Sequence, residues 1–397
     1  MKFLPLLAGI MVAAGTTVMA STDARQTPSD GVLIAPRENN GLDDAGLLLL
    51  TRSARPRRLL ATRWSTVAVA GRDGPFAVER RGPLAERRPL VVVAQGQARE
   101  IPDSVDARCV SWSPDRQTLS YLTGTVALLP GSRLGHPTWT IDGTLWLVDL
   151  KAPPSPRAIA TGVLPLSECP SWAPRGHTLA YVVRAPPAWR LIVWRDGRSR
   201  AIADRDQVSV AYRMFDWAPR SQQLVFLDGS ALFRWSSGKP MRVTSAAALA
   251  GVGVDASDRF LHSLRFSPDG RLIAVAIGGE TAILASGGRF VRKVPGTLNG
   301  WAGDGGVLTL RGELHGVTLR LYPVDGSRPN RVISLHFKYY VVSDPNGHWF
   351  AYASPHAVYF RRPDGSLLRR VPFASFFPWV LAGFTADGRV IEPISAY

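Results

Sequence analysis

The chain has 397 residues, of which 46% are hydrophobic and 20% are charged. These values are typical of a globular protein and exclude wholesale disorder, collagen and coiled coil. The 37 Gly and 31 Pro residues favour many short strands over long helices. The net charge of +16 favours anionic partners.

The positive charge comes almost entirely from arginine. Lysine stands at only five positions (2, 151, 239, 293 and 338), so 42 of the 47 basic residues are Arg. Genomic base composition also produces such a bias. A generally basic surface and a dedicated anion-binding face are therefore both compatible with the sequence.

Residues 1–20 have the layout of a secretory signal peptide. Lys2 is followed by an apolar stretch from Phe3 to Ala14, and small residues precede Ser21. The alternative is an uncleaved anchor, but the apolar core is shorter than a membrane-spanning helix needs. We expect cleavage after Ala20 and a periplasmic or secreted mature protein with no transmembrane span. Export disfavours nucleic acid as a partner and favours an envelope protein or an anionic ligand.

The mature chain is predicted to begin with a flexible arm over residues 21–57, followed by one domain over residues 58–397. The first part of the arm is rich in Thr, Ser, Asp, Asn and Gly. Strand-like runs follow at 66–70, 75–79 and 90–94. We expect these runs to supply outer strands to the last repeat unit, so that the two chain ends close the structure together.

An internal repeat extends along the rest of the chain. Its mark is a turn of the form aromatic-small-Pro-Asp-Gly, and the clear copies are Trp112-Ser-Pro-Asp-Arg, Trp172-Ala-Pro-Arg-Gly, Trp217-Ala-Pro-Arg-Ser and Phe266-Ser-Pro-Asp-Gly. Weaker copies lie at 301–305, 344–347 and 384–388. Successive copies are 60, 45, 49, 35, 42 and 41 residues apart, which is typical of four-stranded propeller blades.

Short runs of β-branched and aromatic residues follow each turn, as at 118–122, 178–183 and 223–226. Proline presets the first corner of a tight turn, and Asp or Gly tolerates the second. Each copy is therefore predicted to join the innermost strand of a blade to the next strand. The aromatic residue before the turn is expected to pack between neighbouring blades.

These turns resemble those of the extracytoplasmic TolB-like and WD-repeat-like β-propellers. The resemblance covers residues 58 to 397 and implies an all-β fold, a single β-propeller of four-stranded blades. Seven turns predict seven blades, with six or eight as alternatives. TolB carries a further α/β domain before its propeller, and residues 21–57 are too few to form one. The resemblance therefore implies the propeller alone.

Cys109 and Cys169 are the only cysteines, and they occupy equivalent places four residues before the small residue of successive turns. Equivalent points on neighbouring innermost strands converge near a propeller axis, within the distance that a disulfide requires. An oxidising compartment permits the bond. A disulfide and two buried free thiols are both compatible with the sequence.

A column of polar residues lies five positions before the small turn residue in five repeats. Its members are Arg108, Glu168, Arg213, His262 and Tyr339. At the start of innermost strands, this column is expected to face the mouth of the central channel. The interpretation is a ligand-binding or partner-binding site, although a channel mouth is wet and polar in any propeller.

No sequence motif identifies a reaction. The seven His residues show no metal-ligand spacing, and the chain has no nucleophile elbow, phosphate-binding loop or dinucleotide fingerprint. We therefore expect no metal, no cofactor and a non-enzymatic propeller that acts as an interaction scaffold in the bacterial cell envelope. The alternative hypothesis is a hydrolase or lyase that acts on a sugar or lactone at the channel mouth, with acid and base groups from Glu168, His262 and Tyr339.

Overall fold

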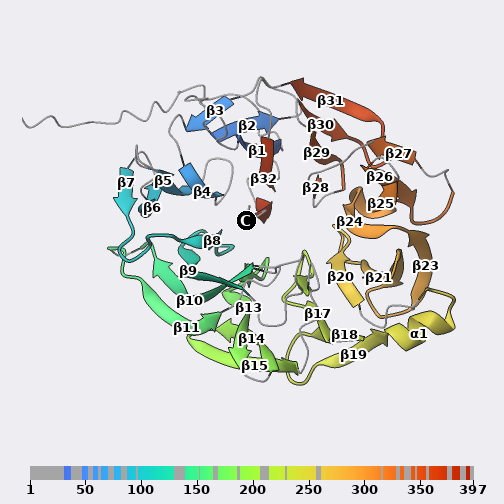
Figure 1. Ribbon diagram of the computed structural model, residues 1–397, viewed down its shortest axis with the longest axis horizontal. Helices are drawn as coiled ribbons and strands as arrows, with labels where there is room; N and C mark the ends of the chain where they lie inside the picture. Colours follow the sequence, from blue (N-terminus) through green and yellow to red (C-terminus); the bar gives the residue numbers. More distant parts are fainter. Residues whose placement is uncertain are drawn as a thin grey trace, which may run out of the picture.

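The computed structural model describes residues 31–36, 47–51, 57–60, 64–69, 76–81, 87–94, 97–128, 139–151, 153–163, 169–185, 188–205, 214–228, 230–255, 261–313, 316–327, 331–334, 341–344, 347–354, 357–372, 378–384 and 390–393. The described chain is almost entirely β-strand. Its strands pair antiparallel in short sheets that stand around a central axis, as in a β-propeller (Figure 1). This confirms the predicted all-β class.

Each sheet is built from strands that follow one another in the chain. The first four-stranded sheet holds β4 (Trp64–Val69), β5 (Phe76–Arg81), β6 (Arg87–Ala94) and β7 (Gln97–Glu100). The next group holds β8 (Arg108–Trp112), β9 (Thr118–Leu128), β10 (Trp139–Asp149) and β11 (Arg157–Val163). The third holds β12 (Ser171–Trp172), β13 (Thr178–Ala185), β14 (Ala188–Arg195) and β15 (Arg198–Arg205). A single pair, Val163 with Val183, joins the last two groups into one eight-stranded sheet.

Four more four-stranded sheets continue the ring. The first two are β16 (Phe215–Trp217), β17 (Leu224–Asp228), β18 (Ala231–Trp235) and β19 (Met241–Ser245), then β20 (Leu261–Phe266), β21 (Leu272–Ile277), β22 (Glu280–Ala285) and β23 (Phe290–Pro295). The others are β24 (Thr297–Trp301), β25 (Gly306–Glu313), β26 (Gly316–Pro323) and β27 (Arg331–Ser334), then β28 (Val341–Ser343), β29 (Phe350–Ser354), β30 (Ala357–Arg361) and β31 (Leu367–Pro372). A short helix α1 (Ala246–Gly251) follows β19 and is capped by the Ser245 side chain, and a 3-10 turn spans Gly303–Gly305.

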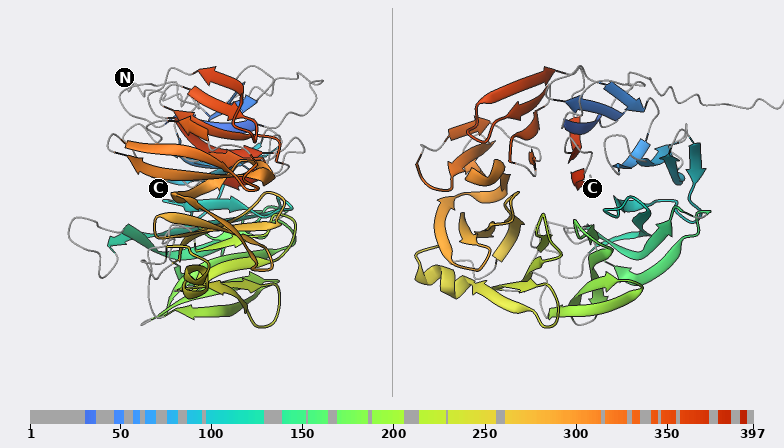
Figure 2. Two further views of the ribbon diagram at one scale, coloured as in Figure 1. Left: turned by 90° about the vertical axis from the view of Figure 1, so that its right-hand side faces the viewer. Right: turned by 180° about the vertical axis from the view of Figure 1, so that it is seen from behind.

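The last sheet joins the two ends of the described chain. It contains β1 (Gly31–Pro36), β2 (Leu47–Thr51) and β3 (Arg57–Leu60) together with β32 (Pro378–Phe384) and β33 (Val390–Pro393). β1 pairs antiparallel with β32, so the two chain ends meet in one sheet (Figures 1 and 2).

Two expectations for the N-terminal region were wrong. The predicted arm over residues 21–57 contains β1 and β2, because Gly31–Pro36 and Leu47–Thr51 are apolar runs that pair in the sheet with β32. The strand-like runs between residues 66 and 94 do not complete the last blade. They form the separate β4–β7 sheet, which carries none of the seven turns.

Burial falls from the axis toward the rim. β21 is buried along nearly its whole length, whereas β19 begins with two exposed residues. The core lies between neighbouring sheets, and its largest cluster spans strands β13 to β22 with Phe226, Leu232 and Leu264 at its centre. Strands buried on both faces need apolar residues at every position, which explains why their sequences read as continuous apolar runs.

Repeated turns lie near the start of most of the sheets. In the first clear copy, the Ser113 hydroxyl donates to Asp115 Oδ1 at 2.6 Å and accepts from the Thr118 backbone N–H at 2.9 Å. Ser267 repeats both bonds with Asp269 and Leu272, at 2.6 and 3.0 Å. The Ser-Pro-Asp sequence therefore holds the hairpin through its own side chains, which is why the motif recurs.

Candidate functional site

Only part of the predicted polar column falls on residues whose side chains the structure describes. Arg108 opens β8, is half-buried and lies opposite Leu122 of β9. His262 lies near the start of β20. The other members, Glu168, Arg213 and Tyr339, lie outside the described residues, as does the predicted signal peptide. Arg108 and His262 thus mark the same end of two innermost strands, away from the aromatic turns.

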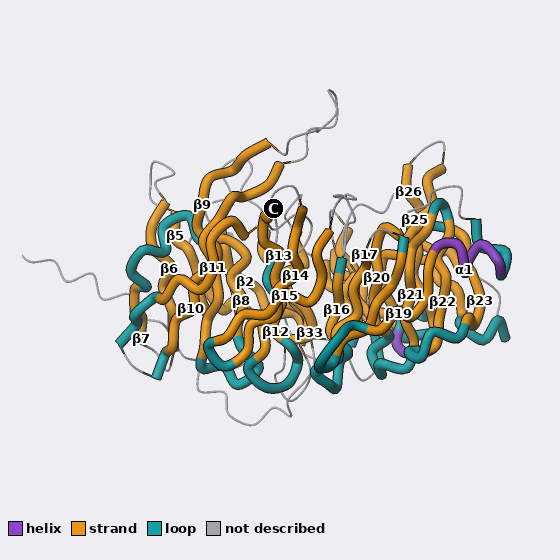
Figure 3. The backbone as a smooth tube through the Cα atoms, turned by 90° about the horizontal axis from the view of Figure 1, so that it is seen from below, coloured by secondary structure: helices purple, strands orange, loops and turns teal. Residues whose placement is uncertain are grey.

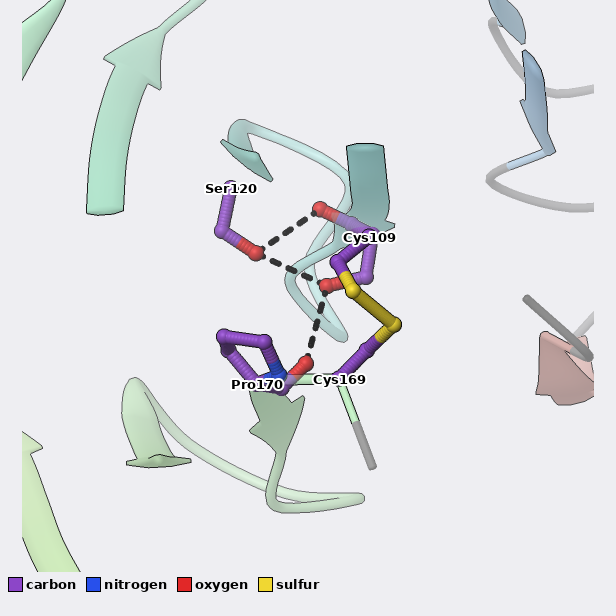
Figure 4. Close-up of a disulfide and its surroundings, with 5 residues drawn as sticks. Cys109, Ser120, Cys169 and Pro170 are labelled. Atoms are coloured by element: carbon purple, nitrogen blue, oxygen red, sulfur yellow. Dashed lines mark hydrogen bonds between the residues drawn. A yellow bond between two sulfur atoms is a disulfide. The ribbon is translucent and has the colours of Figure 1, made fainter. Parts of the chain in front are cut away.

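The two cysteines are bonded to each other. Their sulfur atoms are 2.12 Å apart and their Cα atoms 5.1 Å apart, and the bond joins β8 to the residues just before β12 (Figure 4). Cys109 is 7% exposed. Of the two states that the sequence allowed, the structure has the disulfide, at equivalent places on neighbouring innermost strands.

A hydrogen-bond network lies next to the disulfide (Figure 4). The hydroxyls of Ser111 and Ser120 are 2.7 Å apart, and Ser111 Oγ lies 3.5 Å from the Pro170 carbonyl oxygen. The indole N–H of Trp172 donates to Ser120 Oγ at 3.0 Å. Buried hydroxyls are costly unless they are bonded, so these contacts hold β8 and β9 against β12 in one arrangement.

At the turn end of the same two strand groups, His177 Nε2 lies 2.6 Å from Asp115 Oδ2. The imidazole also meets Trp172 edge-on, with ring centroids 5.9 Å apart. Burial alone raises the pKa of Asp115, but hydrogen bonds from Ser113, His177 and the Gln117 backbone N–H outweigh it and lower that pKa. The serine donates to the aspartate and not to the histidine. This order couples two turns and does not activate a nucleophile, because a nucleophilic serine needs the base beside it.

The Asp115–His177 pair makes the free energy of unfolding depend on pH in the acidic range. Because the pKa of Asp115 in the folded protein lies below its ordinary value of 3.8, the ionised carboxylate stabilises the fold above about pH 4, and this contribution is lost as the pH falls through the folded pKa. Urea unfolding of wild type between pH 5 and pH 2 is expected to show a steeper loss of stability than Asp115→Asn. The difference should stay below about 1 kcal/mol, because both side chains are partly exposed.

His177→Gln is the matched control, since Gln222 occupies the equivalent place in the next turn. It removes the imidazole and keeps the carboxylate, so its pH dependence should be intermediate. Parallel curves for wild type and Asp115→Asn would contradict the assignment.

The aromatic turn residues connect neighbouring blades, as predicted. Besides Trp172, the indole N–H of Trp217 donates to the Ser171 carbonyl at 3.0 Å, and that of Trp301 donates to the Arg265 carbonyl at 3.3 Å. Trp217 and Trp301 thus bond to the innermost strand of the preceding strand group, and Trp172 bonds to the second strand, β9. The junction of the β8–β11 group with the β12–β15 group is fastened at several levels: the disulfide, the serine network, the Asp115–His177 pair and the outer pairing of Val163 with Val183.

A two-stranded ribbon rises from this junction, and its extension was not predicted from the sequence. β9 and β10 stay in register from Thr118 opposite Asp149 to Leu128 opposite Trp139. β8 pairs with β9 only as far as Leu122, and β11 pairs with β10 only from Gly143 onward. Beyond that level the two strands pair only with each other among the described strands. Six residues of extended chain reach about 20 Å, and Figure 3 shows β9 rising beyond most of the ring on one side.

Residue types alternate along the ribbon. Cross-strand pairs with two apolar members, Leu128 with Trp139 and Val126 with Ile141, alternate with pairs that contain polar residues, such as Thr125 with Asp142. Cross-strand partners share one face of a pleated ribbon. The residue pairs therefore divide into an apolar set and a more polar set. The alternation of residue types was present in the sequence, but no turn motif marked these residues as a hairpin.

Within the described parts of the chain, no group of three His, Cys, Asp or Glu residues is arranged to hold a metal ion. The only described helix segments are too short and too small to cross a membrane.

Comparison with known proteins supports the propeller fold and shows no closer relationship. No protein-family model matches the chain, and no curated protein matches it. The solved structure of dipeptidyl peptidase 4 from Porphyromonas gingivalis superposes with a TM-score of 0.54 at 11% identity, covering 87% of this chain and 60% of that one. TolB from Acinetobacter baumannii has a TM-score of 0.34 at 14% identity, covering 74% and 77%. Sqt1 from Chaetomium thermophilum, bound to the N-terminus of ribosomal protein L10, has 0.45 at 14%, covering 77% and 86%.

Proposed function

We propose that this protein is an exported, non-enzymatic β-propeller that serves as a protein-interaction scaffold in the cell envelope. Its partner docks on the face from which the β9–β10 ribbon rises. The observation that carries the proposal is the ribbon itself, which extends past its neighbouring strands from the most firmly fastened junction described in the ring. Interaction sites on rigid supports lose less conformational entropy when they bind.

The blade arrangement of this scaffold is a closed ring of eight blades. Six of the turns lie between the first two strands of six contiguous strand groups, and the seventh lies between β32 and β33 of the closing sheet. The β4–β7 sheet is the eighth group and carries no turn. The sheet of β1–β3 with β32 and β33 supplies the closing blade. Neighbouring innermost strands are in contact from β33 to β4, β4 to β8 and β8 to β12, and again from β16 through β20, β24 and β28 to β33. The indole of Trp217 bridges the remaining step from β12 to β16.

An extracytoplasmic location is supported by two independent features. Residues 1–20 have the layout of a signal peptide. The disulfide between Cys109 and Cys169 fits an oxidising compartment, since such bonds are rare in the cytosol.

The chemistry of the ribbon favours a protein partner. Both edges of its outer part lack a described neighbouring strand, so their backbone groups are available for an added strand. Two of its cross-strand pairs consist of apolar residue types, which are common at the cores of protein interfaces. Arg108, a member of the predicted polar column, belongs to the same proposed face, because it lies opposite Leu122, at the level where the ribbon leaves the sheet.

The test is to shorten the ribbon without touching its base. Gly124 and Gly143 are direct cross-strand partners, so residues 125–142 can be replaced by Asn-Gly, which forms a tight two-residue hairpin. We expect the melting temperature to stay within a few degrees of wild type and capture of the envelope partner to be lost. The comparison uses purified shortened and wild-type protein as baits in envelope extract.

Site-specific photo-crosslinking controls for indirect effects. A crosslinker at Thr140 of the ribbon should label the partner, whereas one at Arg175, exposed in a turn at the other end of its strand group, should not. Equal capture by the shortened variant, or labelling from Arg175 alone, would refute docking on the ribbon face. The Arg108→Ala/Arg213→Ala variant tests whether the polar column contributes to the same contact.

A further inference from the structure

The outermost strands of the propeller carry mostly positive charge. These strands are β3, β7, β11, β15, β19, β23, β27 and β31, which lie at the periphery in Figure 1. Every one of them contains at least one arginine. Within these eight described strands the only acidic residues are Glu100 and Asp204.

The innermost strands show no such pattern. Among β4, β8, β12, β16, β20, β24, β28 and β33, the charged residues are Arg108, Asp216, Arg265 and Glu392, with His262 as the only histidine. The described outermost strands are therefore richer in positive charge than the described innermost strands. This distribution separates the basic surface from the ribbon and from the predicted polar column.

The basic side chains at the perimeter are accessible. Exposed arginines stand on three consecutive outermost strands, β11, β15 and β19, and again on β27 and β31. They define what we call the rim band: Arg157, Arg198, Arg200, Arg242, Arg331 and Arg370. Asp204 forms a salt bridge with Arg190, in which Arg190 Nε lies 2.6 Å from Asp204 Oδ1. Among the described residues, none of the rim-band arginines forms a salt bridge, and Arg331 donates to a backbone carbonyl, that of Asp364, at 3.0 Å.

Protection of exposed strand edges explains why charged residues lie at these positions, but it does not explain why most of them are positive. Charged residues on an exposed edge prevent pairing with another sheet, and acidic residues do this as well as basic ones. The basic residues of the rim band are all arginine. Arginine suits the binding of anionic groups better than lysine, because its planar guanidinium binds carboxylate, sulfate and phosphate groups through two parallel hydrogen bonds.

We propose that the rim band binds a linear anionic polysaccharide, which runs along the perimeter from blade to blade. A flat lipid surface can contact only one sector of a circular perimeter at a time, whereas a flexible chain can follow successive outermost strands. The disulfide fits a compartment outside the cytoplasm, where polysaccharides are the common linear polyanions. This site is independent of the proposed partner-docking face.

The test compares two variants of equal charge. The rim variant is Arg157→Gln/Arg198→Gln/Arg200→Gln/Arg242→Gln, which interrupts the band over three consecutive strand groups. The control variant is Arg175→Gln/Arg184→Gln/Arg220→Gln/Arg271→Gln, which removes exposed arginines that are not on outermost strands. Heparin is the sulfated probe and polygalacturonate the carboxylated one, and binding is measured by calorimetry over a range of salt concentrations.

We expect the rim variant to bind long heparin at least tenfold more weakly than wild type and the control variant to change by less than twofold. The slope of log affinity against log salt should become shallower by about 0.9 for each anionic group that the variant no longer neutralises, the value known for duplex DNA. Wild type should also bind long heparin at least tenfold more tightly than a tetrasaccharide, because only a long chain spans several blades. Heparin should protect rim-band arginines, and not Arg175 or Arg220, from modification by hydroxyphenylglyoxal.

Several outcomes would overturn the proposal. Equal losses of affinity in the two variants would indicate unspecific attraction to net charge, and a tetrasaccharide that binds as tightly as the long chain would indicate a compact pocket. Tighter binding to vesicles of phosphatidylglycerol and phosphatidylcholine would assign the band to a membrane surface. Tighter binding to duplex DNA than to either polysaccharide at the same salt would assign it to nucleic acid. Circular dichroism of both variants confirms that the fold is intact.

Discussion

Replacing Cys109 and Cys169 together by alanine is expected to lower the free energy of unfolding by about 4 kcal/mol. The disulfide closes a loop over a sequence separation of 60 residues, and a cross-link of that span removes much conformational freedom from the unfolded chain. Alanine buries no hydroxyl, and it keeps a Cβ at residue 109, whose φ is +52°, so the backbone conformation is equally demanding in both proteins. Equilibrium unfolding in urea under non-reducing conditions measures the difference.

A reducing agent provides the control for this experiment. Wild type with its disulfide reduced should unfold at nearly the same urea concentration as the alanine variant, because neither chain is cross-linked. Equal stability of the two proteins without reductant would show that the bond contributes nothing. Since the closed loop contains β9, β10 and β11, the ribbon should also become more accessible to limited proteolysis once the bond is removed.

Trp172→Ala is expected to destabilise the protein by about 3 to 5 kcal/mol, the usual cost of truncating a buried tryptophan. Trp172 is 8% exposed and packs edge-on against Trp194, with ring centroids 6.1 Å apart. It therefore fills the junction between two strand groups and donates a hydrogen bond across it. Urea unfolding monitored by far-UV circular dichroism gives the change without relying on tryptophan fluorescence.

Trp172→Phe separates packing from hydrogen bonding. It retains much of the aromatic volume and removes the indole N–H, so it should cost only about 1 to 2 kcal/mol, while Ser120 keeps its bond to Ser111. If the alanine and phenylalanine variants are equally stable, the side chain does not fill the junction as the structure indicates.

The repeat was readable from sequence because each turn encodes its own geometry. Ser113 and Ser267 hold their hairpins by bonds to residues two to five positions away, so the motif can be recognised from a short stretch of sequence. The equivalence of Cys109 and Cys169 in successive repeats allowed their disulfide for the same reason. Local periodicity thus predicted the strands, the inter-blade aromatic residues and a candidate cross-link.

Features that depend on distant residues were not predictable in this way. The pairing of β1 with β32 has no local signature, which is why the N-terminal strands were expected to be an arm. Asp115 and His177 are 62 residues apart, and neither turn sequence indicates that the two side chains make contact. The rim band became visible only when the strands were ordered from axis to perimeter, because six arginines scattered along the sequence then fell on outermost strands.

The sheet shared by β1 and β32 has a consequence for the timing of synthesis. Its first strands leave the ribosome early and its last ones near the end, so this sheet cannot assemble until almost the entire described chain has been made. Every other strand group is contiguous in sequence and can form as it emerges. Pairing between such remote segments is slow to find, because a large entropy loss precedes the contact. During that interval β1 and β32 present unpaired edges, and a chaperone that shields them would act at this one sheet.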